Sequence, residues 1–235
     1  MSRRTDETLI YTNFEKDQHM TRIAGVSARK AGLLVKIIYG FTRRGLAQLA
    51  GRDLKHMLEP LEIYAQIPGL LLGYAVLEWA TAELGYVNKR LRCLAELKAA
   101  TLTHCEYCID LGSQAARLVG LSDEQLLALP RYRESELFTD LEKLVLDYAV
   151  GMSRTPVDVP EALFAKMRQH FNEAQLVELT HVIALENLRG RFNLALGIGA
   201  AGFSEGMVCA IPAPAIEAQQ ADHLEHLHEA SNDRF

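Results

Sequence analysis

The chain has 235 residues, a formal net charge of -5 and a pI near 5.9. This acidic balance disfavours nucleic acid as the main partner, and no apolar run is long enough to predict a membrane span. The polar start of the chain predicts no secretory signal peptide. Four cysteines are too few for a disulfide scaffold, so the composition predicts a cytoplasmic protein with no membrane partner.

The first part of the chain, residues 1–53, is predicted to hold an N-terminal arm and short helices. Residues 1–26 are polar and lack periodicity, which indicates a loose arm. Apolar residues from Leu33 to Phe41 then recur at helical spacing, and residues 42–45 predict a break before another short helix. Because this apolar helix lies outside the main helical region, we expect it to pack across a subunit boundary.

Residues 54–206 are predicted to form one helical domain, and residues 207–235 a loop and polar tail. Apolar periodicity predicts successive helices at about residues 58–64, 68–85, 91–102, 105–119, 122 onward, 135–152, 160–171 and 173–196. No segment of useful length alternates with the period of two that is typical of a strand. The predicted fold class is therefore all-α.

Several residues at the predicted helix ends are typical of caps. Pro68 suits a first helical turn, and Gly120 suits the position just after a helix. Ser122 and Asn172 each precede a glutamine by three residues, which is capping-box spacing. Ser135 is predicted to cap the helix 135–152.

The two cysteines of the stretch Cys105-Glu106-Tyr107-Cys108 stand three positions apart. Thr103 is the predicted N-cap of the following helix, which would place both cysteines in its first turn. Unpaired N–H groups and the positive end of the helix dipole favour a thiolate there. Since the thiolate is the reactive form of cysteine, the pattern favours thiol–disulfide chemistry over a structural disulfide or a metal site.

Zinc is the other common use of this spacing, but a zinc site needs four ligands. Cys93 and Cys209 stand alone in the sequence and are interpreted as small buried hydrophobic residues. The remaining candidates are three histidines in the polar tail, His223, His226 and His228. We therefore predict no metal and no cofactor.

Three parts of the chain, together with their helix order, carry a family resemblance. They are Cys105-Glu106-Tyr107-Cys108, the turn Gly120-Leu121-Ser122-Asp123-Glu124, and a C-terminal helix with Gln175-Leu176-Val177-Glu178-Leu179, Glu186-Asn187 and Arg191-Phe192-Asn193. Over about residues 54–206 the chain resembles the carboxymuconolactone decarboxylase and alkylhydroperoxidase D-like family. The resemblance implies an all-helical, oligomeric fold. For redox members it also implies peroxidase activity, with Cys108 as the attacking thiol and Cys105 as its resolving partner.

The chain differs from the redox members at two positions. These members usually carry a histidine four residues after the second cysteine and a glutamate twelve residues before the first. Here these positions are Gly112 and Cys93. Because both family groups relay the proton of the nucleophilic thiol, we expect slow peroxide turnover. The decarboxylase branch works without a cysteine pair, so the pair points away from that branch.

Other residues could replace the missing base. Glu96 lies one helical turn from the position of the missing glutamate and is the predicted substitute. His104 adjoins the first cysteine and could hold its thiolate, or be a surface or capping residue. His181 could supply an imidazole if its helix packs over the cysteines, or could be a helix-face residue. Glu106 and Asp110 are interpreted as carboxylates that interact with the helix dipole.

The apolar helix 173–196 also contains a group of polar residues. They are predicted to form an internal or subunit-interface network, because buried polar groups need partners: Glu186, Asn187, Arg191 and Asn193. A substrate-binding role is the alternative.

The sequence thus predicts a homo-oligomeric, thiol-dependent peroxidase or disulfide reductase. Its substrate would be a small peroxide or a protein disulfide, and a thiol would donate the electrons. One alternative is a lactone- or decarboxylase-type enzyme in which acid–base groups act and the cysteines do not. The other is a non-catalytic helical assembly protein.

Overall fold

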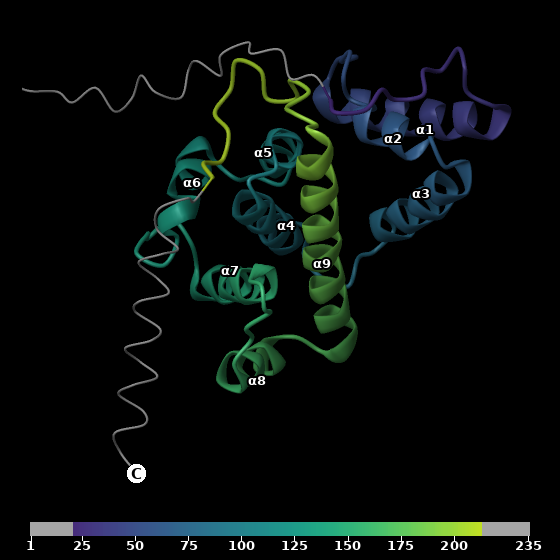
Figure 1. Ribbon diagram of the computed structural model, residues 1–235. Helices are drawn as coiled ribbons and strands as arrows, with labels where there is room; N and C mark the ends of the chain where they lie inside the picture. Colours follow the sequence, from purple (N-terminus) through teal and green to yellow (C-terminus); the bar gives the residue numbers. More distant parts are fainter. Residues whose placement is uncertain (1–20, 213–235) are drawn as a thin grey trace, which may run out of the picture.

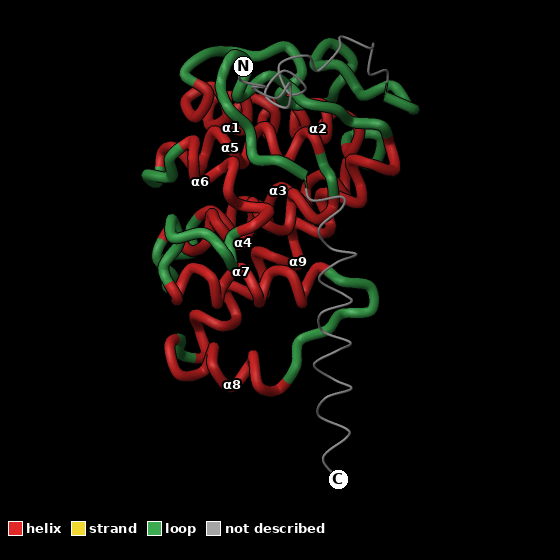
Figure 2. Tube along the Cα trace, turned by 90° about the vertical axis from the view of Figure 1, so that its left-hand side faces the viewer, coloured by secondary structure: helices red, strands yellow, loops and turns green. Residues whose placement is uncertain are grey.

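The computed structural model describes residues 21–212 (Figures 1 and 2). Its helices are α1 Leu33–Ala50, α2 Glu59–Tyr64, α3 Pro68–Ala82, α4 Lys89–Thr103, α5 Glu106–Leu118, α6 Asp123–Ala128, the 3-10 turn η2 Leu129–Arg131, α7 Asp140–Ser153, α8 Glu161–His170 and α9 Glu173–Leu196. These described residues contain no strand, which confirms the predicted all-α class. Residues 1–20 of the predicted arm, and the tail histidines His223, His226 and His228, lie outside the described residues.

Helix α4 lies at the centre of the fold, with α5, α7 and α9 packed around it (Figure 1). Leu94 and Leu97 of α4 belong to a hydrophobic cluster shared with α1, α2 and α5. Ala95 and Ala99 belong to a second cluster shared with α7, α8 and α9. Burial of apolar surface on two sides stabilises α4, and this fixes the position at which the chain enters α5.

Side-chain caps set several helix ends. Ser122 and Asn172 form the predicted capping boxes at the starts of α6 and α9, so both predictions are confirmed. The prediction for Ser135 is wrong, because Thr139 caps α7 instead. The backbone N–H of Glu142 donates to Thr139 Oγ1 at 3.2 Å, and the N–H of Thr139 donates to the Glu142 carboxylate at 2.8 Å.

Helix α1 runs without a break through residues 42–45, so the predicted interruption there is wrong. A glycine inside a helix costs only about 1 kcal/mol, and no proline lies in this segment to remove a hydrogen bond. The helix ends instead at Gly51, whose φ of 69° is the left-handed conformation that glycine adopts easily.

Helices α1, α2 and α3 lie together at one side of the bundle (Figure 1). These helices carry exposed apolar side chains: Leu33 and Phe41 of α1 are each 77% exposed, and Trp79 of α3 is 67% exposed. Within residues 21–212, no helix is long and apolar enough to cross a membrane.

The segment after α9 folds back onto α5 through one buried carboxylate. Asp110 Oδ2 accepts hydrogen bonds from the N–H groups of Ala201, Gly202 and Phe203 at 2.7–2.9 Å. Its Oδ1 accepts a fourth bond, from the N–H of Ser204, at 2.7 Å. The structure therefore shows that Asp110 anchors a loop, beyond the dipole interaction predicted for it.

Candidate active site at the start of helix α5

The chain passes from α4 to α5 through a single left-handed residue, His104, with a φ of 58°. Thr103 is the last residue of α4, where its hydroxyl donates to the carbonyl of Ala99 at 3.2 Å. The prediction that Thr103 caps α5 is therefore wrong. Cys105 is the N-cap, and its Sγ accepts from the backbone N–H of Cys108 at 3.2 Å.

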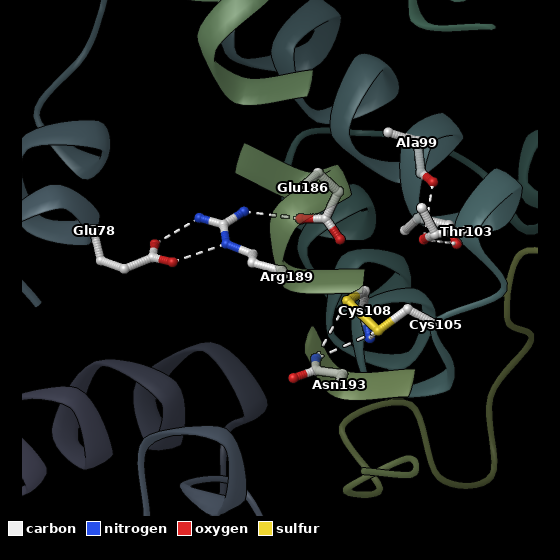
Figure 3. Close-up of a disulfide and its surroundings, with 9 residues drawn as sticks. Glu78, Ala99, Thr103, Cys105, Cys108, Glu186, Arg189 and Asn193 are labelled. Carbon is white, nitrogen blue, oxygen red and sulfur yellow. Dashed lines mark hydrogen bonds and ion pairs between the residues drawn. A yellow bond between two sulfur atoms is a disulfide. The ribbon is translucent and has the colours of Figure 1, made fainter. Parts of the chain in front are cut away.

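Cys105 and Cys108 are joined by a disulfide, and their Cα atoms lie 5.2 Å apart (Figure 3). Asn193 of α9 points at this pair, with its side-chain nitrogen 3.4 Å from Cys105 Sγ and 3.6 Å from Cys108 Sγ. Cys105 is fully buried and Cys108 is 6% exposed. The two cysteines are therefore largely shielded from solvent, and the Asn193 amide contacts both sulfur atoms.

A cavity of about 970 Å³ opens beside the disulfide. Cys108 lines it and Cys105 does not. The wall is mostly apolar and includes Phe41, Val76 and Leu111, so α1, α3 and α5 each contribute. Of the two cysteines, Cys108 is thus the one that a molecule in the cavity can reach.

The polar part of the cavity wall is a group of three carboxyl groups and one guanidinium. Arg189 of α9 donates to both carboxylate oxygens of Glu78, from α3, at 2.8 and 2.5 Å. It also donates to Glu186 Oε2 at 2.8 Å and lies 4.0 Å from Glu96 Oε1. Figure 3 shows the guanidinium held between Glu78 and Glu186, about one turn of α9 before Asn193. We call Glu78, Glu96, Glu186 and Arg189 the carboxyl cluster.

The members of the carboxyl cluster have different acidities. Burial raises the pKa of Glu96 to about 7, and the negative charge of Glu186 adds to this effect. Burial also raises the pKa of Glu186, against the opposing charge of Arg189. Burial opposes the ionisation of Glu78 as well, but the hydrogen bonds and charge of Arg189 outweigh it and lower the pKa of Glu78. Glu96 is therefore a carboxyl group of the cavity that can exchange a proton near neutral pH.

The structure brings some of the predicted site residues together and leaves others apart. Glu96 and Cys108 line the same cavity. His104 is exposed and does not line it. His181 shares a 2.8 Å hydrogen bond with Thr81 of α3 and precedes Asn193 by twelve residues, or about 18 Å along α9. The catalytic roles of these residues stay predictions.

The sequence did not single out Arg189 or Glu78, although both belong to the site. They are separated by 111 positions in the chain, so no local pattern links them. Glu186 and Asn193 were recognised only as members of a polar group in α9. Arg191 and Asn187 of that group lie elsewhere and contact Thr155 and Ser153, respectively.

The other thiols do not share the helix terminus that the paired cysteines occupy. Cys93 lines the cavity, but burial raises its pKa to about 12. Burial also raises the pKa of Cys209. Both thiols therefore stay protonated at neutral pH and are weak nucleophiles. Among residues 21–212 no group of three or more histidine, cysteine or acidic side chains is placed to hold a metal ion.

The helical architecture is that of the alkylhydroperoxidase D-like class of proteins. Residues 68–150 match the model of the Carboxymuconolactone decarboxylase family. The protein YnjA of Escherichia coli (strain K12) is 36% identical over 171 residues, which are 72% of this chain and 91% of YnjA. The chain belongs to the carboxymuconolactone decarboxylase family, as its sequence predicted.

Two solved structures illustrate the shared fold. The debrominase Bmp8 without ligand has a TM-score of 0.66 and 16% identity, over 78% of this chain and 94% of Bmp8. A peroxidase-related protein from Silicibacter sp. TM1040 has a TM-score of 0.62 and 18% identity, over 78% of this chain and 93% of that protein. At these identities the likeness concerns the fold.

Proposed function

We propose that the protein is a thiol-dependent peroxidase whose redox centre is the Cys105–Cys108 pair. The observation that carries the proposal is that Cys108 faces a cavity while Cys105 is buried behind it. Such a placement suits one sulfur that meets the substrate and a second that closes a disulfide with it. The peroxidase-related protein of the same fold adds support.

The proposed reaction has three steps. In the reduced protein the Cys108 thiolate attacks one peroxide oxygen, so that an S–O bond forms and the O–O bond breaks. The departing oxygen takes a proton and leaves as an alcohol or as water, and Cys108 becomes a sulfenic acid. The Cys105 thiol then attacks Cys108 Sγ; the S–S bond forms, and the hydroxyl group leaves with the thiol proton as water. A dithiol donor returns the disulfide to two thiols with two electrons.

Glu96 is the residue we assign to the proton transfers. It lines the same cavity as Cys108, and its pKa of about 7 allows it to take and return a proton near neutral pH. The start of α5 supports the Cys108 thiolate through the helix dipole. The proposal gives no step to His104 or His181, because neither lines the cavity.

The geometry favours a small peroxide over a protein disulfide as the oxidant. Cys108 is only 6% exposed, and it is reached from an apolar cavity. A disulfide on the surface of another protein could not approach Cys108 without a rearrangement of the surrounding helices. We propose a cytoplasmic setting for this reaction, because thiol donors are kept reduced there.

Peroxide consumption with a dithiol donor tests the proposal in single-cysteine variants. We expect Cys108→Ser to abolish turnover. Cys105→Ser should stop after one equivalent of peroxide and leave a sulfenic acid on Cys108, which dimedone traps for mass spectrometry. Cys209→Ser is the matched control, because Cys209 does not line the cavity, and it should turn over like the wild type. A Cys108→Ser variant as active as the wild type would refute the assignment.

The carboxyl cluster supports a second candidate, an acid–base enzyme in which the cysteines take no part. Glu96 has the pKa that general acid–base catalysis needs. Alkylation of the reduced cysteines separates the two functions: it abolishes thiol-dependent turnover and leaves acid–base turnover largely intact.

A further inference from the structure

The carboxyl cluster has more negative than positive groups. Glu78, Glu96 and Glu186 all line the cavity, and Arg189 is the cation that pairs with them. Arg92, which also lowers the pKa of Glu96 by its charge, does not line the cavity and lies 3.7 Å from a different carboxylate, Glu178. The single positive charge of Arg189 balances one carboxylate, so ionisation of any two of the three carboxyl groups gives the cavity wall a net negative charge.

One carboxylate oxygen in the cluster has no hydrogen-bond partner. Glu186 is 6% exposed; its Oε2 accepts from Arg189, whereas its Oε1 is buried and unpaired. Figure 3 shows the two oxygens of Glu186, with only one directed at the guanidinium. A buried acceptor without a donor costs about 1–3 kcal/mol. Because Oε1 itself has almost no accessible surface, a ligand in the cavity could donate to it and remove that cost only if the Glu186 side chain turned toward the cavity.

The rest of the cavity suits an apolar molecule. Its aliphatic wall comes mainly from α1 and α3. Tyr64 also lines it and stacks on Phe192 and Tyr74, with ring centroids 4.0 and 4.4 Å apart. Aromatic rings accept both apolar groups and cations. A ligand of this cavity would therefore have an apolar body and a polar end that reaches the carboxyl cluster.

We propose that the cavity binds an amphipathic amine, with its alkyl or aryl body against α1 and α3 and its ammonium group against Glu186. The ammonium N–H groups would donate to the unpaired Oε1, and the positive charge would offset the excess of carboxylates. Glu96 of α4 lines the same cavity and would be a second acceptor for the ammonium N–H groups. A carboxylic acid of similar length should bind poorly, because the same carboxylates repel it.

This proposal rests on the proposed function only in taking this cavity as the substrate site. Binding and turnover are therefore measured separately. Binding to the Cys108→Ser variant tests the ligand class without any thiol chemistry, whereas peroxide turnover tests the thiols. Failure of one measurement leaves the other interpretable.

The experiment compares three probes with the same ten-carbon chain: decylammonium, 1-decanol and decanoate. Trp79 is the only tryptophan of the chain and lines the cavity, so its fluorescence reports occupancy. At pH 7.5 and below micelle-forming concentrations, we expect decylammonium to bind at least about tenfold more tightly than 1-decanol, as a charge-assisted hydrogen bond allows. Decanoate should bind more weakly than the alcohol.

Substitutions of single glutamates test which carboxyl group causes the preference for decylammonium. Glu186→Gln should bring the affinity for decylammonium to within about threefold of that for 1-decanol, with 1-decanol binding unchanged. Glu173→Gln removes the same charge from an exposed position of α9 and should bind all three probes like the wild type. If Glu186→Gln does not fold, as judged by circular dichroism, Glu96→Gln serves in its place and should reduce the preference for the amine.

The proposal is overturned if the wild type binds the three probes equally or decanoate best. It is also overturned if folded Glu186→Gln and Glu96→Gln variants both keep the full preference for decylammonium.

Discussion

At the scale of single residues, the site depends on Glu96, a carboxyl group whose pKa burial raises to near neutral pH. Glu96 has an ordinary pKa of 4.5 in the unfolded chain and about 7 in the folded protein. The folded state therefore holds this proton more tightly than the unfolded state does. The contribution of Glu96 to stability is fully present below pH 4.5 and is lost as the pH rises through about 7.

We predict that Glu96→Gln reduces the pH dependence of the free energy of unfolding. The free energy of unfolding of the wild type should fall between about pH 4.5 and 7 relative to that of the variant. Urea denaturation of both proteins at several pH values measures this difference. Glu186, whose pKa burial also raises, stays in both proteins, and the measured difference therefore includes its coupling to Glu96. A wild-type-minus-variant difference that is the same at pH 5 and pH 7.5 would contradict the raised pKa.

Gly112 offers a second test at this scale. It lies four residues after Cys108 in α5, so the two positions share a helix face, and it lines the cavity. A Cβ there would meet Leu97 Cδ1 at 3.0 Å, the flexible end of a side chain that can shift. We predict that Gly112→His raises peroxide turnover by about tenfold or more, since a placed imidazole can transfer the thiol proton. Gly112→Ala controls for the new Cβ. Equal turnover rates for the two variants would refute a role of the imidazole in proton transfer.

At the scale of helices, the site exists because α9 approaches α4 very closely. Gly190 permits this contact: a Cβ on it would lie 2.4 Å from Thr103 Oγ1 and 2.8 Å from Thr103 Cβ. The same stretch of α9 carries Arg189, which belongs to the carboxyl cluster, and Asn193, which contacts the disulfide. The absence of a side chain at Gly190 therefore sets the distance between α9 and α4, the two helices on either side of this crossing.

We predict that Gly190→Ala destabilises the protein by about 1–3 kcal/mol, because the added methyl group pushes α9 away from α4. It should also weaken turnover, since Asn193 moves with the helix. Gly73→Ala in α3 is the control, because a Cβ there has no neighbour within 4 Å; it should be neutral or stabilising by up to about 1 kcal/mol. Thermal or urea denaturation compares the two, and equal stabilities would contradict the role of Gly190.

The sequence predicts helices well where local signals are strong. The predicted bounds of α9 agree with the structure because Asn172 caps its start and Gly197 ends it with a left-handed residue. Local signals mislead where two are close together: Thr103 has a suitable side chain for a cap, but α4 continues through Thr103, the chain turns at His104, and Cys105 caps α5. The ion pair of Arg189 with Glu78 depends on tertiary packing, which no spacing in the sequence encodes.

At the scale of the whole molecule, the outer surface of α1 and α3 requires an explanation. Large apolar side chains that do not line the cavity are exposed there, among them Leu33, Leu34 and Leu70. Scattered exposed apolar residues are normal, but a contiguous apolar surface on a protein marks an interaction site. The sequence predicted that the helix carrying Leu33 and Phe41 packs across a subunit boundary, and its exposure is compatible with that prediction.

We predict that a second copy of the chain covers this surface and that sedimentation shows a species larger than a monomer at micromolar concentration. Leu33→Glu should weaken self-association by about tenfold or more, because it places a charge in an apolar interface. Leu33 does not line the cavity, and a carboxylate is tolerated in the first turn of α1, so the fold itself should persist. Gln169→Glu adds the same charge to an exposed position of α8 and should leave association unchanged. A wild type that sediments as a monomer would rule out this interface.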